Sequence, residues 1–443
     1  MVNETLKRNN MQLLNIKLRK NSFLEVGLGY TPEQAMEEAA RCIGCKDKSC
    51  AFGCAMNVHI PSFIAEVAKG NFEKAYEIVS KGSLMPAVCS RVCSSKAKCE
   101  VQCSRAKDGE PVAIAALERF VADFHNFNET DSKEAPEEFV SNGYKVAVIG
   151  AGPAGLACAA QLAEKGYKVT LFEGRATAGG SFEYGVPRFR LPKAILRQEI
   201  DRLKKRGFKI ITNSSVGHFD ETEKLISEDG YDAVYISECT EIPVKLNISG
   251  ETLKGVISAD SFISWLNAKE VNKFYVEAPY AKGTKTVVFG SGVEALDAAR
   301  CMRRFGTDVT VICPDPESEM DASAEEIQRA KEEDINFLFL TNIVEFSGNK
   351  AGHVESVFCE QLMMTTFPGS NRTKLISLYD SEFEMPADVV IVSNDTVRGR
   401  SMSSDYDSGI FCFKGDSSSI SAMGIGKYDA DLIDSFVKSR VRK

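Results

Sequence analysis

Eight of the fourteen cysteines fall between residues 42 and 103, although the chain is 443 residues long. They have the spacings C-x2-C-x4-C-x3-C and C-x3-C-x5-C-x3-C, and they are Cys42, Cys45, Cys50, Cys54, Cys89, Cys93, Cys99 and Cys103. Thiolates on short, irregular loops suit iron–sulfur clusters, whose ligands are often interleaved between two clusters. Zinc is the alternative, but structural zinc sites usually pair two C-x2-4-C knuckles. The spacing therefore favours iron–sulfur clusters, and with them electron transfer.

A glycine-rich turn follows the short apolar segment KVAVI. Gly150, Gly152 and Gly155 form the pattern G-x-G-x-x-G, with Ala154 inside it, directly before a predicted helix. The first glycine permits the tight turn, the second lets a pyrophosphate approach the backbone, and the third lets the helix pack on the strand. Glu173 ends the next predicted strand, where its carboxylate can accept hydrogen bonds from a ribose. The pattern predicts an adenine dinucleotide, FAD or NAD, and the alternative is a glycine turn without a ligand.

A second unit of this kind has the sequence TKTVVFGSGVEALDAAR. Its turn contains Gly290, Ser291, Gly292 and Ala295, with alanine in place of the third glycine. Its second predicted strand ends at Cys313, where the first unit has an acid, and Asp315 lies two residues further on. Asp315 could contact a ribose instead. This unit predicts a second dinucleotide site, and the alternative is a structural repeat that binds nothing.

The elements that must position these residues differ along the chain. Residues 1–135 contain short helical segments, one of them opened by Thr31 as N-cap, Pro32 and Gln34, a predicted capping box. The two strand–turn–helix units predict doubly wound domains with parallel sheets. We therefore expect an α/β protein with an α-helical domain over residues 1–135, a first Rossmann-like domain over 144–284, a second inserted over 285–376, and a return to the first over 377–443.

Composition and charge restrict the partners. The formal net charge is -8, so no nucleic acid or anionic membrane is expected to bind. The N-terminus lacks the apolar core of a secretory signal, and no apolar run approaches the ~20 residues that span a bilayer. We expect a cytoplasmic protein, where a reducing environment favours metal or redox use of the thiols over disulfides.

Together these motifs resemble the small (beta) subunit family of glutamate synthase, which includes the N-terminal half of dihydropyrimidine dehydrogenase. The segments FLEVGLGYTPEQAMEEAARCIGCKDKSCAFGC, PAVCSRVC and GEPVAIAALERFVAD resemble the family's iron–sulfur domain, and AGGSFEYGVPRFRLPK resembles its flavin-domain signature. The resemblance covers residues 23–340, and the last 70 residues match poorly. It implies two 4Fe–4S clusters in the helical domain, FAD in the first Rossmann-like domain and NAD(P)H in the second.

The resemblance also implies particular ligands. One cluster would be held by Cys42, Cys45, Cys50 and Cys103. The other would be held by Cys54, Cys93, Cys99 and the side-chain oxygen of Glu118. Cys89 matches a cysteine that is not a ligand in the family. For FAD the resemblance adds Gly180, Ser181, Arg190, Val216 and Asp416.

The sequence departs from the family at the second dinucleotide site. Members that use NADPH carry a basic pair that grips the 2'-phosphate, and here those positions are Pro314 and Asp315. Losing two charge-assisted contacts of about 1.5–3 kcal/mol each costs roughly two to four orders of magnitude in affinity, so NAD(H) is preferred to NADP(H). Small residues at two strand ends are also replaced, by Ser237, Glu238 and Cys239 and by Val392, Ser393 and Asn394.

The leading hypothesis is an electron-transfer flavoprotein that passes electrons between NADH and a redox partner protein or large catalytic subunit, through FAD and two 4Fe–4S clusters. No catalytic acid or base is expected. One alternative is an electron-wiring or scaffold subunit that keeps FAD and clusters but has lost nicotinamide binding. Another is the glutamate synthase small subunit itself.

Overall fold

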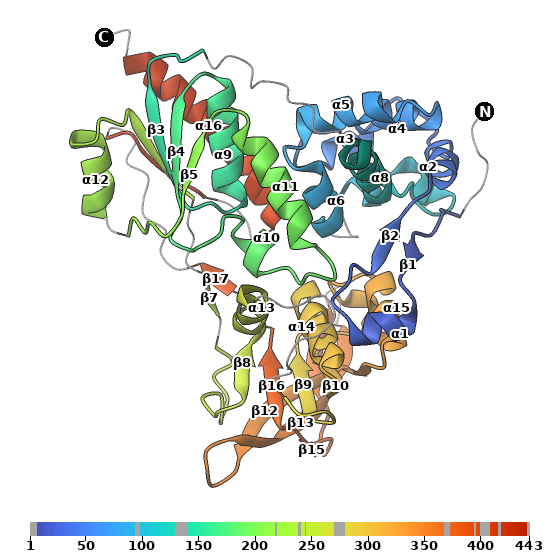
Figure 1. Cartoon of the computed structure of the whole chain (residues 1–443). Coiled ribbons are helices and arrows are strands. Elements are labelled where there is room, and N and C mark those ends of the chain that lie inside the picture. Colours follow the sequence, from blue (N-terminus) through green and yellow to red (C-terminus); the bar gives the residue numbers. More distant parts are fainter. Residues whose placement is uncertain are drawn as a thin grey trace.

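The computed structural model describes residues 7–93, 98–128, 140–217, 219–237, 241–243, 245–269, 280–366, 373–393, 396–398, 408–414 and 418–440. Three parts of the chain lie around a common centre (Figure 1): a helical part, a first sheet with its helices, and a second sheet with its helices. The expected α/β class with a helical N-terminal domain is confirmed.

The helical part begins with a two-stranded antiparallel ribbon and continues with short helices. Its elements are β1 (Gln12–Leu13), α1 (Ile16–Asn21), β2 (Gly27–Gly29), α2 (Pro32–Ala39), α3 (Ser49–Phe52), α4 (Ile60–Ala68), α5 (Phe72–Gly82), α6 (Pro86–Val92), α7 (Lys98–Val101), the 3-10 helix η1 (Ser104–Lys107) and α8 (Ile114–Asn128). The predicted capping box starts α2: the Gln34 amide donates to the Thr31 hydroxyl over 3.3 Å, and the Thr31 amide donates to the Gln34 side chain over 3.0 Å.

The first sheet is parallel, in the order β18-β6-β3-β4-β5. Its strands are β3 (Lys145–Ile149), β4 (Lys168–Phe172), β5 (Lys209–Ile211), β6 (Ala233–Ile236) and β18 (Ile410–Cys412). Its helices are α9 (Pro153–Glu164), α10 (Ser181–Tyr184), α11 (Lys193–Lys204), α12 (Phe219–Ser227) and α16 (Ser419–Arg440). Four residues of β3 are buried, as its continuous apolar run predicts for a central parallel strand.

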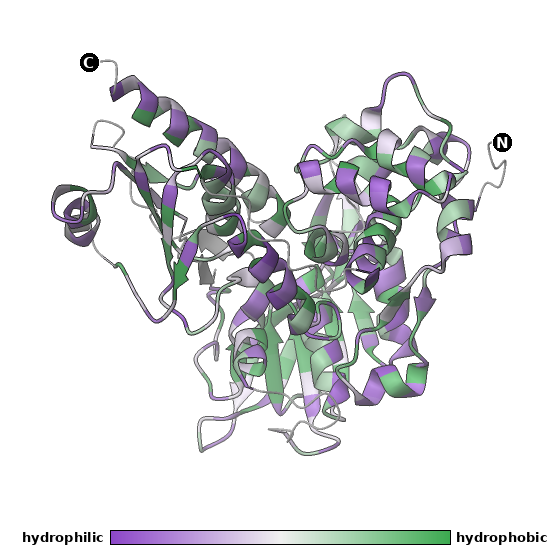
Figure 2. Cartoon of the chain, turned by 45° about the horizontal axis from the view of Figure 1, so that its top comes forward, coloured by the Kyte–Doolittle hydropathy of each residue, from purple (hydrophilic) through white to green (hydrophobic). Residues whose placement is uncertain are grey.

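The second sheet is also parallel, in the order β11-β10-β9-β16-β8. Its strands, largely hydrophobic in Figure 2, are β8 (Val256–Ser258), β9 (Lys285–Phe289), β10 (Asp308–Cys313), β11 (Asn336–Phe339) and β16 (Val389–Val392). Its helices are α13 (Ala259–Ala268), α14 (Val293–Arg304), the 3-10 helix η2 (Glu317–Glu319) and α15 (Ala324–Glu332).

Two strand pairings correct the expected domain boundaries. The strand β16 lies between β9 and β8 in the second sheet, so the expected return to the first domain at residue 377 is wrong for Val389–Val392. The strand β8 belongs to the second sheet as well, although it precedes residue 285. The hydrophobic periodicity could not show which sheet β8 and β16 join, because an apolar strand fits either parallel sheet. The chain does return to the first sheet at β18, which pairs with β6.

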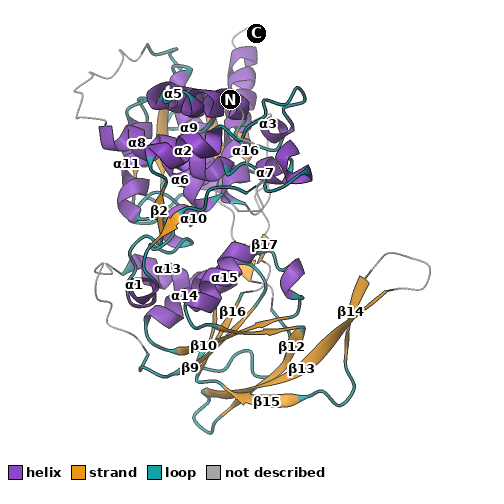
Figure 3. Cartoon of the chain, turned by 90° about the vertical axis from the view of Figure 1, so that its right-hand side faces the viewer, coloured by secondary structure: helices purple, strands orange, loops and turns teal. Residues whose placement is uncertain are grey.

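An antiparallel sheet follows β11 and projects away from the helices (Figure 3). It contains β12 (Thr341–Gly348), β13 (Val354–Thr366), β14 (Thr373–Ser377) and β15 (Phe383–Pro386). A short ribbon pairs β17 (Thr396–Arg398) with β7 (Glu241–Pro243). Within the described residues, no helix is long and apolar enough to cross a membrane.

The helical part and the first sheet domain share one hydrophobic core. Phe63 of α4, Leu117 of α8, Leu156 of α9 and Met423 of α16 belong to the same buried cluster. The helix α16 makes this possible, because it packs on both parts. A Cβ atom on Gly426 would lie 2.2 Å from the carbonyl oxygen of Ala154, so only glycine allows α16 to come this close to α9.

We expect the substitution Gly426→Ala to destabilise the protein, because the added methyl group would push α16 away from α9. Overpacking of this kind costs about 1–3 kcal/mol. Alanine is the better helix former by about 1 kcal/mol, so a lower thermal unfolding midpoint would have to come from the lost contact. The control is Gly217→Ala, whose Cβ would meet no atom within 4 Å. An unchanged or higher midpoint for Gly426→Ala would contradict the close packing.

Candidate functional site

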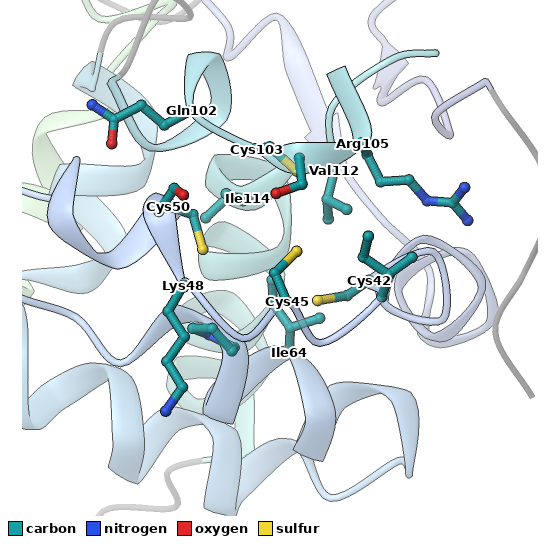
Figure 4. A pocket seen from close by; sticks show the side chains of 14 residues that line it. Cys42, Cys45, Lys48, Cys50, Ile64, Gln102, Cys103, Arg105, Val112 and Ile114 are labelled. Atoms are coloured by element: carbon teal, nitrogen blue, oxygen red, sulfur yellow. The ribbon is translucent and has the colours of Figure 1, made fainter. Parts of the chain in front are cut away.

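Four of the predicted metal ligands line one pocket in the helical part. Cys42 and Cys45 come from the segment between α2 and α3, Cys50 lies in α3, and Cys103 precedes η1. Their side chains point toward a common space (Figure 4). Apolar side chains, Ile64 among them, line the rest of the wall. The structure therefore brings together the four residues of the first predicted ligand set, although Cys103 is distant in sequence from the other three.

The thiol groups that line this pocket suit a positively charged metal group. Burial, together with the neighbouring thiols of Cys103 and Cys42, raises the pKa of Cys50 to about 11. Burial also raises the pKa of Cys42. Several thiolates in one buried pocket need positive charge among them, and a bound metal supplies it as the thiol protons leave. Across the described part of the chain, no group of three or more His, Cys, Asp or Glu is placed to hold a single metal ion.

The second predicted ligand set also gathers in one place. Burial, together with the nearby Glu118 carboxylate and Cys54 thiol, raises the pKa of Cys93 to about 12. The pKa of Cys99 is raised by burial and by the neighbouring Cys93, Cys54 and Glu118. Glu118 comes from α8, and burial raises the pKa of its carboxyl to about 7. The half-buried Glu118 carboxyl is thus close enough to the thiols of Cys54, Cys93 and Cys99 to shift their pKa values; its role as a ligand stays a prediction.

Cys89 lies close to this second set, since the Glu118 carboxylate and the Cys93 thiol add to the effect of burial in raising its pKa. It is buried, and its sulfur is 3.8 Å from the sulfur of Met423 on α16. A Cβ atom on Gly424, one residue further along α16, would lie 2.5 Å from the carbonyl oxygen of Ala55. The helix α16 is therefore in direct contact with the residue that follows Cys54. That Cys89 is not a ligand stays a prediction.

The first glycine turn has room for a phosphate group. Gly150 has a φ of +92°, which favours glycine. A Cβ atom on Gly155 would lie 1.9 Å from the Gly150 carbonyl oxygen and 2.6 Å from the Ser237 hydroxyl, so this glycine lets α9 pack on the turn. A Cβ atom on Gly152 would meet nothing within 4 Å. The space beside Gly152, at the start of α9, is open where the pattern places a pyrophosphate.

Glu173 lies at the end of β4 beside this turn. Its carboxylate is buried and accepts hydrogen bonds from the amides of Ala151 and Arg175, each over 2.8 Å. The turn and the acid are therefore held together by the backbone, and each carboxylate oxygen keeps a lone pair that could accept from a ribose. Ala154, in the same turn, is buried and its carbonyl contacts α16.

Two further residues predicted for FAD lie at the same turn. Gly180 has a φ of +52°, and a Cβ atom there would lie 2.6 Å from the Gly152 Cα. The Ser181 and Ser419 hydroxyls are 2.7 Å apart, which connects this segment to the start of α16. Val216 is half-buried in the loop after β5 and packs against the first sheet. Asp416 lies outside the described residues, as do Glu238, Cys239 and Asn394.

Arg190 lies between the two sheet domains. Its guanidinium pairs with Asp297 of α14 over 3.1 Å and with Glu326 of α15 over 3.0 Å. These carboxylates raise the pKa of Arg190 against the opposing effect of its burial. The side chain is thus committed to the second sheet domain, and its predicted contact with FAD stays a prediction.

The second glycine turn has the same backbone but a different lining. Gly290 has a φ of +143°, and a Cβ atom there would lie 2.3 Å from the Ser393 carbonyl oxygen. Ser291 follows it half-buried, and Ala295 is buried in α14. A Cβ atom on Gly292, however, would lie 3.0 Å from a carboxylate oxygen of Glu294. This carboxylate occupies the position that is open beside Gly152 in the first turn.

Glu294 was not among the residues predicted from the sequence, although its place in the first turn of a helix behind a glycine turn was a signal. The Glu294 side chain is exposed, yet partial desolvation of its carboxyl and the nearby Asp297 carboxylate raise its pKa. Asp315 is half-buried just beyond the end of β10, where a ribose acid was predicted. The second site is therefore more acidic than the first, through Glu294 and Asp315.

Comparison with known proteins agrees with this arrangement. A family described as "Dihydropyrimidine dehydrogenase domain II, 4Fe-4S cluster" matches residues 19–130, and one described as "Pyridine nucleotide-disulphide oxidoreductase" matches residues 144–392. The fold of FprA from Mycobacterium tuberculosis in complex with NADPH is similar, with a TM-score of 0.55 and 18% identity over 68% of this chain and 86% of FprA.

Several curated proteins are similar over most of this chain. The putative oxidoreductase AegA of Escherichia coli K12 is 31% identical over 86% of this chain and 58% of its own length. The beta subunit of the NADP(+)-dependent formate dehydrogenase of Moorella thermoacetica is 32% identical over 77% of this chain and 50% of its own. The glutamate synthase (NADPH) small chain of Escherichia coli K12 is 30% identical over 85% of this chain and 80% of its own.

The fold and the sites define an oxidoreductase with an iron–sulfur domain and two dinucleotide-binding domains. The chain belongs to the pyridine nucleotide-disulphide oxidoreductase family, as a divergent member of the glutamate synthase small chain and dihydropyrimidine dehydrogenase type. The resemblance found in the sequence is thereby confirmed. The chain spans about half of the length of AegA and of the formate dehydrogenase subunit.

The pocket geometry predicts which cysteines hold iron. We expect Cys103→Ala to remove about half of the iron of the purified protein, because it takes one ligand from the pocket of four thiols. The matched control is Cys89→Ala, which changes a buried cysteine that contacts Met423 and should leave the iron content unchanged. Iron is measured chemically per chain under anaerobic conditions. Equal losses in the two variants would contradict the assignment of ligands.

Proposed function

We propose that this protein passes electrons between NADH and a partner protein through FAD and two 4Fe–4S clusters. The observation that carries the proposal is the position of α16. It contacts the first glycine turn through Gly426 and the Cys54 loop through Gly424, so one helix joins the predicted flavin site to the second set of cysteines. A flavin accepts a hydride and releases single electrons, and iron–sulfur clusters carry those electrons onward.

The residues of the first sheet domain fit FAD. Gly152 and the start of α9 would hold the pyrophosphate, since the space there is open and the helix amides point toward it. The Glu173 carboxylate would accept from the ribose while it keeps the turn in place through the Ala151 amide. Gly180 lets its own segment lie against the turn, which closes the site from the side of α10.

The residues of the helical part fit two clusters. The pocket of Cys42, Cys45, Cys50 and Cys103 would hold one, and Cys54, Cys93, Cys99 and Glu118 would hold the other. Cys50 and Cys54 are only four residues apart, yet Cys54 does not line the pocket of Cys50. This separation supports two clusters with interleaved ligands over a single centre.

NADH is the preferred nicotinamide in this proposal. Pro314 and Asp315 offer no positive charge to a 2'-phosphate, and Asp315 would repel it. Relatives with "NADPH" or "NADP(+)" in their names are matched at about 30% identity only, so their cofactor need not be shared. The partner protein is proposed because these relatives are named as subunits or small chains of larger enzymes.

A second candidate function is an electron-wiring subunit that keeps FAD and the clusters without binding nicotinamide. The Glu294 carboxylate favours it, because this group lies where a pyrophosphate would approach Gly292. Two anions at one helix start repel each other. The two candidates differ in whether Glu294 moves aside for NADH.

Anaerobic mixing with nicotinamides tests the proposed function. We expect protein with about eight irons and one FAD per chain, whose flavin absorbance is bleached by NADH and at least about a hundredfold less efficiently by NADPH. Stopped-flow absorbance measures both rates. Protein that carries both cofactors but is not bleached by about 1 mM NADH would support the second candidate. Protein with only one cluster or no flavin would contradict the proposal itself.

The substitution Glu294→Gln tests the role of the carboxylate. Removing this charge should tighten NADH binding about tenfold, or about 1.4 kcal/mol, because the pyrophosphate then meets no anion at Gly292. The dependence of the flavin bleaching rate on NADH concentration, followed by stopped flow, measures the dissociation constant. The control is Glu345→Gln, which removes an exposed acid from β12 of the same domain. An equal change in both variants, or none in either, would show that Glu294 does not limit binding.

A further inference from the structure

The pocket of Cys42, Cys45, Cys50 and Cys103 adjoins a groove on the protein surface at Cys103. This cysteine, together with Ser49 and Gln102, lines both the thiol pocket and an open groove on the outer surface. An electron crosses between proteins most readily where the distance between redox centres is shortest. The groove is therefore the natural point of exchange for a cluster in this pocket.

Large hydrophobic side chains are exposed around the groove. Phe52, at the end of α3, is 85% exposed, and Val101, at the end of α7, is 65% exposed. The two helices pack side by side, and both residues line the groove. Ile43, next to the ligand Cys42, is 46% exposed. Exposed aromatic and aliphatic side chains at a hollow are typical anchors of a protein interface.

Asp47 and Lys107 line the groove itself, and the two segments that form its rim carry an excess of basic residues. Residues 43–53 and 98–108 contain five basic and three acidic residues, and one of the acids, Glu100, is buried and paired with Arg8. Lys46, Lys48 and Lys107 are exposed. The chain as a whole has a formal net charge of -8. A basic rim on an acidic protein attracts a partner with an acidic face and orients it there.

We propose that the surface formed by Ile43, Phe52, Val101 and the basic rim docks an electron-carrying protein with an acidic face around its own redox centre. The inference rests on the proposed function, because it assumes a cluster in the thiol pocket. One electron passes at each encounter, from the reduced centre of one protein to the oxidised centre of the other, and no bond forms between them. Two such electrons and two protons from water convert one FAD to FADH2.

The test uses a plant-type 2Fe–2S ferredoxin with an acidic surface, whose potential of about -400 mV makes it a strong donor. The reduced ferredoxin is mixed anaerobically with the full chain carrying its clusters and FAD, and flavin bleaching is followed by stopped flow. Phe52→Glu and Lys107→Glu should each slow the reaction about tenfold or more at low salt. The wild-type rate should fall as salt is added. Phe127→Glu, at an 88% exposed position near the end of α8, should leave the rate unchanged.

Three further measurements separate the outcomes. They are the rate of flavin reduction by dithionite, the iron and flavin contents of each variant, and the oligomeric state from light scattering. Equal cofactor contents and equal dithionite rates in all variants show that the clusters and the flavin are intact, so a selective loss with ferredoxin supports docking here. Equal ferredoxin rates in Phe52→Glu, Lys107→Glu and wild type would overturn the docking surface alone. So would a dimer that Phe52→Glu converts to a monomer, because the surface would then bind a second copy. Wild-type protein that lacks iron or flavin would overturn the proposed function as well.

Discussion

The close contact of α16 with two other parts of the chain is the constraint on which the rest of this structure depends. Gly426 lies against the Ala154 carbonyl at the first glycine turn, and Gly424 lies against the Ala55 carbonyl in the cysteine region. Any larger side chain at either place would separate the parts by the width of a methyl group or more. Lys427 adds a hydrogen bond of 2.7 Å to the Gly82 carbonyl at the end of α5. The predicted flavin and cluster sites therefore belong to one continuous core.

The second sheet domain is joined to this core by different forces. Phe23 and Val26 from the N-terminal segment and Phe189 from the first sheet domain are buried with α14 in one hydrophobic cluster. Arg190, next to Phe189, adds two ion pairs to α14 and α15. Because Arg190 is largely buried, breaking these pairs would leave an uncompensated charge and would cost more than an exposed ion pair. The second glycine turn is thus held in a fixed place relative to the first.

The two glycine turns show how one backbone motif can differ in its electrostatics. Both turns have a glycine with positive φ and a close helix behind it, yet the first is open beside Gly152 and the second contains the Glu294 carboxylate. A helix start favours a negative group. In the first turn that place is free for a phosphate, whereas in the second the protein's own side chain takes it. This difference bears directly on whether the chain takes its electrons from a nicotinamide.

The sequence by itself determined the fold class, the family and the two glycine turns, because these depend on local patterns: cysteine spacing, apolar strands and glycine positions within a few residues. The capping box at Thr31 is local in the same sense. Only the tertiary structure decided that β8 and β16 belong to the second sheet, since an apolar strand fits either one. It also decided that the Glu294 carboxylate lies beside Gly292, and it brought Cys103 into a pocket with Cys42 and without Cys54, which the family resemblance had implied and the cysteine spacing alone had not. Those facts depend on contacts between residues distant in sequence and on side-chain direction, which no local pattern contains.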